Sequence, residues 1–204
     1  KLNEELFAMQ GKEQRKNRID TLLGPGLNIH RSPLNGRNFE YFSEDPYLAG
    51  KMAASYVRGI QSKGVYACPK HFAVNSQELR RMAMNAVIDE RTLREIYLTG
   101  FEIAVKEGGA KCLMTSYNQV NGTYANENEH LLMDILRGEW KYEGMVVTDW
   151  GGSNDHVRGV GESIRIVREG GGVHDHRGFL VGGLVHPVHH FGFVVGLAHL
   201  DFEA

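Results

Sequence analysis

The chain has few cysteines and lacks the sequence signatures of several common catalytic loops. Its two cysteines, Cys68 and Cys112, are too far apart in sequence for a CxxC redox or zinc motif, and two cannot form a disulfide scaffold. No GxxxxGK[ST], GxSxG or HExxH pattern occurs, so phosphate-loop, serine-hydrolase and zinc-protease functions have no motif support. We expect both cysteines to be small buried hydrophobic residues.

The sequence also lacks an excess of charge of either sign. It has 23 Lys and Arg residues against 25 Asp and Glu residues, which gives a formal net charge of -2 at pH 7. Nucleic-acid-binding surfaces usually carry clustered basic charge, so we expect no nucleic-acid partner. Residues 1–20 lack the apolar core of a signal peptide, and no compartment is assigned.

Residues 157–204 differ in composition from the rest of the chain. They are rich in Gly, Val and His, and the last lysine of the chain is Lys141. We place a boundary near His156 and expect a divergent Gly/His-rich tail, which is either frame-shifted and therefore poorly ordered, or a divergent natural extension. Its histidines lack the spacing of a zinc site, so no metal is expected. Four histidines and Pro187 interrupt Phe179–Leu200, so no membrane partner is expected.

Residues 1–156 alternate between helical and strand-like segments. Pro46 stands at the first position of one helix, and Asp89 caps another. Strands that alternate with helices of ten or more residues are typical of parallel βαβ units, so the fold class is α/β, as an open sheet or a barrel. The expected helices are 3–20, 46–62, 90–107 and 126–136, the last stopped by Gly138, and the expected strands are 21–23, 64–68, 110–115 and 144–148.

Polar and aromatic side chains gather just after the expected strands. The carboxyl ends of parallel neighbouring strands meet at one edge of a sheet, so these side chains would converge there. A carboxylate beside an aromatic ring, with cationic and hydroxyl donors around it, suits a sugar, because the ring stacks on apolar sugar faces and the donors bind hydroxyls. The residues at these positions are Arg37, Lys70, His71, Tyr117, Asn118, Asp149 and Trp150.

Five of these residues also have a purely structural interpretation. Asp149 precedes a glycine-rich loop and could form a turn or cap a helix. Trp150 could pack in the core, Lys70 and His71 could be a solvated pair, and Arg37 could form a salt bridge within its loop. The functional interpretation rests on their repeated placement at strand ends. Cationic neighbours would also keep Asp149 ionised, as a nucleophile requires.

Five sequence motifs resemble those of glycoside hydrolase family 3 β-glucosidases. The longest is GPGLNIHRSPLNGRNFEYFSEDP at residues 24–46. The others are KHFAVN at 70–75, DERTLREIY at 89–97, MTSYN at 114–118 and VVTDW at 146–150. They stand in the order of the family and cover about residues 3–156. The resemblance implies that residues 1–156 are part of the N-terminal catalytic domain, a partial (β/α) barrel of parallel strands alternating with helices.

The resemblance also implies a role for each site residue. Asp149, in the Thr-Asp-Trp motif, corresponds to the catalytic nucleophile. Glu40 and Asp45 are expected to be structural, in loop hydrogen bonds and the turn into the next helix. Arg37, Lys70 and His71 match residues that hold sugar hydroxyls, Met114 and Tyr117 match residues near the nucleophile, and Trp150 matches a pocket wall.

The implied activity is hydrolysis of terminal non-reducing β-D-glucosyl residues by a retaining mechanism, on a carbohydrate substrate and without a cofactor. In the family a second, later domain supplies the general acid, and an earlier segment contributes an Asp and an Arg. Neither has a match in this sequence. The carboxylates Glu78, Glu127 and Asp155 are present, but none stands in a matching motif, so no acid is named.

Three other functions stand beside β-glucosidase activity. A β-xylosidase or related exo-glycosidase of the same family fits the same motifs. A β-N-acetylhexosaminidase is disfavoured, because that branch has Lys-His-Phe-Pro-Gly where this chain has Lys-His-Phe-Ala-Val-Asn at 70–75. From another class, an inactive sugar-binding fragment would keep the nucleophile pocket without an acid.

Overall fold

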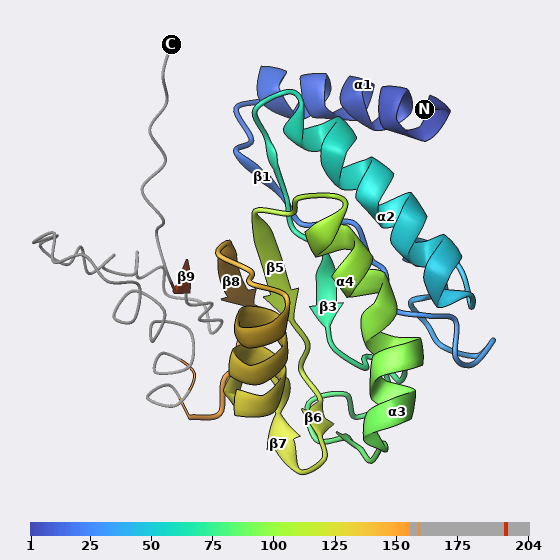
Figure 1. The fold of residues 1–204 in the computed structure, drawn as a ribbon, viewed down its shortest axis with the longest axis vertical. Coiled ribbons are helices and arrows are strands. Elements are labelled where there is room, and N and C mark those ends of the chain that lie inside the picture. The colour runs from blue at the N-terminus through green and yellow to red at the C-terminus, as the bar shows by residue number, and fades with distance from the viewer. Residues whose placement is uncertain (156–158, 160–193, 196–204) are drawn as a thin grey trace, which may run out of the picture.

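The computed structural model describes residues 1–155, 159 and 194–195, and in them parallel strands alternate with helices (Figure 1). The α/β fold class expected from the sequence is confirmed. Apart from residues 159 and 194–195, the expectation of a divergent tail at 157–204 and the histidines within it lie outside the described residues. Within the described part of the chain, no helix is long and apolar enough to cross a membrane.

Two helices cross closely at one end of the molecule (Figure 1). They are α1 (Leu2–Lys16), which ends before the expected Asp20, and α2 (Pro46–Gln61). A Cβ atom at Gly59 would lie 2.6 Å from the Glu4 carbonyl oxygen, so only glycine allows this approach. The α2 helix begins as expected: Pro46 is in its first turn, and the Asp45 carboxylate accepts a hydrogen bond from the Leu48 backbone N–H at 2.9 Å.

The described strands form three sheets, two of them built mainly from parallel neighbours. In the first, β1 (Thr21–Leu22) pairs with β2 (Tyr66–Ala67). In the second, β5 (Cys112–Thr115) lies between β3 (Lys70–Phe72) and β8 (Met145–Thr148), and all three run parallel. The short strand β9 (Val194–Val195) pairs antiparallel with β8. The carboxyl ends of β3, β5 and β8 therefore share one edge of the sheet, the edge where ligands bind in parallel α/β folds.

The two faces of this sheet are packed differently. Phe72, Leu113 and Val146 face the helices and belong to the main hydrophobic core. Cys68 and Cys112 belong to a separate small cluster with Met114, and their Sγ atoms are 3.1 Å apart as free thiols. Both cysteines are fully buried, as the sequence analysis expected.

The helix expected at 90–107 is continuous but not uniform. It consists of α3 (Glu90–Thr92), the π-helix η2 (Leu93–Leu98) and α4 (Thr99–Lys106). Asp89 caps it as expected, by accepting a hydrogen bond from the Thr92 backbone N–H at 3.0 Å. The helix expected at 126–136 consists of the 3-10 helix η3 (Ala125–Glu127) and the π-helix η4 (His130–Glu139). Gly138 does not stop it, contrary to expectation.

Several short elements were not expected from the sequence. The residues Lys70 and His71 lie within strand β3 and not in a loop after β2. The strands β6 (Gln119–Val120) and β7 (Thr123–Tyr124) form an antiparallel hairpin, and β4 (Asn85–Ala86) pairs with β6. Asn121 and Gly122 form its turn with φ of 51° and 91°. An Asn-Gly dipeptide is the usual sequence signal of such a turn. The 3-10 helix η1 (Asn38–Glu40) also went unpredicted.

Candidate active site

Asp149 lies at the carboxyl end of β8, as expected. Thr148 pairs with Thr115 of β5, and the next backbone N–H, that of Asp149, donates to the Thr115 carbonyl at 3.3 Å. The Asp149 Oδ1 atom accepts a hydrogen bond from the Trp150 backbone N–H at 2.8 Å. The residue is only 8% exposed, so its carboxylate has little contact with bulk water. A shielded carboxylate at the strand edge is suited to act on a bound substrate.

His71 faces this carboxylate from the neighbouring strand β3. Its Nε2 atom lies 3.5 Å from Asp149 Oδ2, and its side chain is 2% exposed. Burial, together with the positive charges of Arg37, Lys70 and Arg81, lowers the pKa of His71 to about 2. The imidazole is therefore neutral near pH 7, and it meets Asp149 as a polar neighbour and not as the cation of a salt bridge.

A carboxylate between two cations forms a second part of the site. Glu40 pairs with Arg37 through Oε1 and with Lys70 through Oε2, the latter at 3.4 Å. Burial alone would lower the pKa of Arg37. The hydrogen bond to Glu40 and the nearby negative groups outweigh it, and the pKa is raised. The loop salt bridge considered for Arg37 therefore exists. The solvated-pair interpretation of Lys70 and His71 is wrong, since the Lys70 side chain is 17% exposed.

Tyr117 connects the loop after β5 to the loop after β8. Its hydroxyl donates to the Trp150 carbonyl oxygen at 2.5 Å. Burial and the negative charge of Asp149 raise the pKa of Tyr117 to about 12, so the phenol stays protonated. The Trp150 side chain is exposed, which excludes the core-packing alternative. Met114 is buried on β5, at a register position paired with Lys70 on one side and Val147 on the other.

Arg81 belongs to this group, although sequence reasoning did not single it out. Its guanidinium carbon lies 4.5 Å from the centre of the Tyr117 ring, and it pairs with Glu78 at 3.1 Å. Its charge also acts on His71. In the sequence, the one feature that could have pointed to Arg81 was its place in a polar segment a few residues after the motif at 70–75. Asn118 does not join the site as a donor to substrate, because its amide donates to the carbonyls of Ala73 and Gln119.

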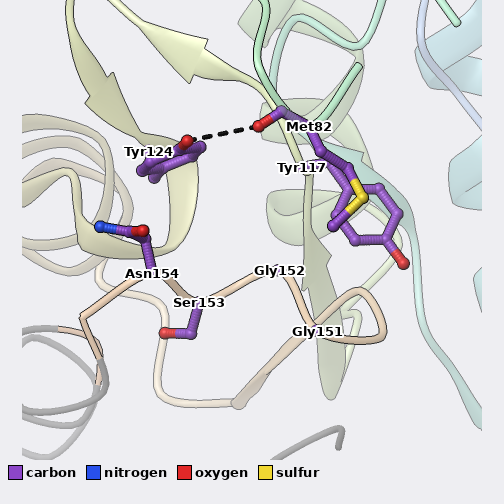
Figure 2. Close-up of a pocket in the computed structure, with 7 residues that line it drawn as sticks. All are labelled: Met82, Tyr117, Tyr124, Gly151, Gly152, Ser153 and Asn154. Atoms are coloured by element: carbon purple, nitrogen blue, oxygen red, sulfur yellow. Dashed lines mark hydrogen bonds between the residues drawn. The ribbon is translucent and has the colours of Figure 1, made fainter. Parts of the chain in front are cut away.

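A hollow of about 110 Å³ lies beside Tyr117 (Figure 2). Figure 2 shows Met82 and Tyr117 on one side of it and the loop 151–154 and Tyr124 on the others. The Tyr124 hydroxyl donates to the Met82 carbonyl oxygen at 3.3 Å, which ties the hairpin to the segment that carries Arg81. Of the site residues expected from the sequence, Tyr117 alone lines this hollow in the described part of the chain.

The family of the chain follows from its match to a protein-family model. Residues 3–167 match the model of the glycosyl hydrolase family 3 N terminal domain. The chain belongs to glycosyl hydrolase family 3. The match includes all the site residues described above, from Arg37 to Trp150. The resemblance of the five motifs is thereby confirmed at the level of the family.

Several relatives of this family 3 chain are named as glycosidases. The chain is 54% identical over 159 residues to thermostable beta-glucosidase B of Acetivibrio thermocellus, an alignment that covers 78% of this chain and 21% of that protein. It is 52% identical over 143 residues to an exo-alpha-(1->6)-L-arabinopyranosidase of Bifidobacterium breve, covering 70% of this chain and 19% of that protein. The chain thus spans about a fifth of the length of these relatives.

A solved structure shares the fold of this chain. Beta-glucosidase 3B of Thermotoga neapolitana, solved in complex with glucose, superposes with a TM-score of 0.78 at 51% sequence identity. The superposition covers 79% of this chain and 23% of that one. The family 3 chain therefore shares its α/β fold with part of that larger protein.

The carboxylates near the site are engaged in structural contacts. Glu78 holds Arg81 and Asn75, and Glu40 holds Arg37 and Lys70. Glu127 is buried, and its Oε1 accepts the backbone N–H groups of Asn154 at 2.7 Å and Asp155 at 2.5 Å. Among the described residues, no group of three His, Cys, Asp or Glu side chains could hold a metal ion.

Proposed function

We propose that this chain is the nucleophile-bearing part of an exo-acting glycosidase that hydrolyses terminal non-reducing β-D-glucosyl residues. The observation that carries the proposal is the placement of Asp149 at the carboxyl end of β8, where it faces His71 at 3.5 Å and is shielded from water. Three cations, Arg37, Lys70 and Arg81, act on the same imidazole and, together with its burial, lower its pKa, so a neutral ring faces the Asp149 carboxylate. The names of the relatives support glucose as the sugar.

In the proposed reaction Asp149 attacks the anomeric carbon of the bound sugar. A C–O ester bond forms, the bond from the anomeric carbon to the leaving oxygen breaks, and the leaving oxygen takes a proton from an acid. Water then attacks the same carbon, the ester breaks, the carboxylate is restored, and the water's spare proton passes to a base. Two inversions retain the configuration of the sugar.

The surrounding residues would bind and orient the sugar. Lys70 and Arg37 present cationic donors to hydroxyl groups, and Glu40 fixes both side chains in place. The neutral His71 adds a donor beside Asp149, and the exposed Trp150 ring offers a stacking face. Tyr117 holds the Trp150 backbone, with Arg81 over its ring, so both keep the nucleophile loop in position.

The general acid is proposed to come from a second domain. Retaining glycosidases place their two carboxyl groups about 5–5.5 Å apart. Glu40, Glu78 and Glu127 already form ion pairs or accept backbone hydrogen bonds, which argues against each as the acid. We propose that the catalytic-domain piece ends between residue 156 and residue 167, where the family match stops, and that the residues after it are a tail of divergent sequence.

A second candidate function is cleavage of a terminal pentosyl residue by the same machinery. The relative from Bifidobacterium breve, named for arabinopyranosidase activity, favours this alternative. A β-xylosidase activity would use the same site. A sugar-binding fragment without turnover is the third possibility, favoured by the engagement of the nearby carboxylates.

Dinitrophenyl glycosides test these alternatives, because so good a leaving group needs little help from an acid. We expect the full chain to release dinitrophenolate from the β-D-glucoside faster than from the β-D-xyloside or the α-L-arabinopyranoside. Asp149→Asn should abolish release, whereas Asp134→Asn, a change on the exposed side of η4, should leave it intact. Faster release from a pentoside would replace the proposed sugar. Saturable glucose binding without any release would support the sugar-binding fragment.

A further inference from the structure

A chain of hydrogen bonds leads from the motif at 24–46 into the candidate site. Tyr41 lies in that motif, is 5% exposed, and places its hydroxyl 3.3 Å from His71 Nδ1. The amide nitrogen of Asn75 donates to the same hydroxyl at 3.4 Å and to Glu78 Oε1 at 3.3 Å. At the other end, His71 Nε2 faces Asp149 Oδ2.

The direction of each hydrogen bond follows from the donors and acceptors available. An amide nitrogen can only donate, so the Tyr41 oxygen accepts from Asn75. The reversed amide would turn its oxygen toward the Glu78 carboxylate, and two acceptors would face each other. With its oxygen accepting from Asn75, Tyr41 has its own proton to donate to His71 Nδ1. That nitrogen then carries no proton.

The opposite end of the imidazole leads to the same tautomer. A neutral imidazole holds one proton, so Nε2 carries it when Nδ1 accepts. The Nε2 proton then points toward the Asp149 carboxylate, at a nitrogen-to-oxygen distance of 3.5 Å. The other tautomer would set a lone pair of Nε2 against the carboxylate. The Tyr41 oxygen would then accept from both Asn75 and Nδ1, and the Tyr41 proton would have no acceptor in this network. Both ends of the network therefore select the same form.

We propose that Tyr41 is a positioning residue that fixes the tautomer of His71, so that its Nε2–H group is directed at the nucleophile and at sugar hydroxyls bound beside it. This inference rests on the proposed function for its catalytic consequence, but the tautomer itself is a property of the free protein. A donor with a fixed direction is worth more to a bound sugar than an imidazole that exchanges between two forms.

The tautomer is read directly from long-range ¹H–¹⁵N spectra of the full, ¹⁵N-labelled chain near neutral pH. The His71 signals are those missing from the spectrum of His71→Gln, among the ten histidines of the chain. We expect the pattern of a neutral ring with a protonated Nε2 and an unprotonated, hydrogen-bonded Nδ1. A protonated Nδ1, or a ring with both nitrogens protonated, would overturn the inference without any variant.

Tyr41→Phe removes only the hydroxyl and keeps the ring that packs against Gly26. We expect the Nδ1 signal to move and the tautomers to mix. We also expect formation of a covalent adduct with a 2-fluoro-glucoside to slow by about 3- to 10-fold, the effect of one net hydrogen bond. Tyr56→Phe is the matched control, because Tyr56 packs against Phe7 in a different cluster and should change neither readout.

The outcomes separate this inference from the proposed function. A Tyr41→Phe variant with an unchanged His71 pattern, or with a wild-type rate of adduct formation, overturns the positioning role. A wild-type chain that forms no adduct contradicts the proposed function, while its His71 spectrum still decides the tautomer.

Discussion

Asn28 and His71 hold each other through two hydrogen bonds that join segments 43 residues apart in sequence. The Asn28 amide donates to the His71 carbonyl oxygen at 3.0 Å, and the His71 backbone N–H donates to the Asn28 side-chain oxygen at 2.8 Å. Both residues are buried. The Asn28 side chain thus pairs with the His71 backbone as a neighbouring strand would. This pairing fixes the position of His71 beside Asp149.

Replacing Asn28 should therefore cost stability. Asn28→Ala leaves two buried backbone groups without this partner, so we expect a loss of about 2–3 kcal/mol in the free energy of unfolding. Urea denaturation followed by circular dichroism measures it. Asn17→Ala, at an exposed helix end, is the control and should stay within about 0.5 kcal/mol of wild type. Equal stability of the two variants would contradict the role of Asn28.

Glu127 is expected to hold the loop that follows the nucleophile. Glu127→Ala removes the acceptor shared by the N–H groups of Asn154 and Asp155, so both amides should exchange with solvent faster. Adduct formation at Asp149 should also slow, because the loop begins there. Glu127→Gln keeps an oxygen at the accepting position and should preserve both properties. If the Ala and Gln variants behave alike, the carboxylate oxygen is not what orders the loop.

His130 of η4 contacts Glu90 of α3, and the strength of this contact should depend on pH. Its hydrogen bond to Asp134 and its contact with Glu90 outweigh partial burial and raise the pKa of His130. A raised folded-state pKa adds stability that is fully present below the unfolded value of about 6.5 and is lost as pH rises through the folded value.

His130→Gln should therefore lower the melting temperature more at about pH 5.5 than at about pH 9. Because His130 is half-exposed, we expect a small difference that shrinks in high salt. Thermal scans at two pH values and two salt concentrations measure it. If His130→Gln lowers the melting temperature by the same amount at both pH values, the ion pairs do not depend on the His130 proton.

Gly59 allows the close crossing of α1 and α2. A Cβ atom there would lie 2.6 Å from the Glu4 carbonyl oxygen and 2.8 Å from the Phe7 Cβ. Backbone cannot give way as a flexible side chain can, so Gly59→Ala should destabilise the chain by about 1–3 kcal/mol. Gly36→Ala is the matched control, because its nearest neighbour would be the Glu78 Cγ at 3.9 Å. Chemical denaturation of the two variants should therefore give clearly different midpoints.

Local signals in the sequence predicted the framework of the fold well. Asp45 and Asp89 cap the helices that they were expected to cap, and Asp149 follows the strand that it was expected to follow. These features depend on neighbours within a few residues. Capping and strand-end placement are therefore visible in a single sequence.

The parts that were missed depend on contacts between distant segments. Nothing near Asn28 in sequence shows that its side chain will pair with the backbone of His71. Arg81 joins the site only because the segment after β3 folds its guanidinium over the ring of Tyr117. The β6–β7 hairpin is the exception, since Asn121-Gly122 was a readable signal.

The most direct test of the central claim is intact-mass and peptide mapping of the full chain after reaction with 2,4-dinitrophenyl 2-fluoro-β-D-glucoside. The fluorine slows release of the covalent intermediate, and the leaving group needs little acid. We predict one fluoroglucosyl adduct per chain, located on Asp149 within residues 144–156 and absent from Asp149→Asn. An adduct on another carboxylate, or no adduct on a folded chain that binds glucose, would contradict the assignment of Asp149 as the nucleophile.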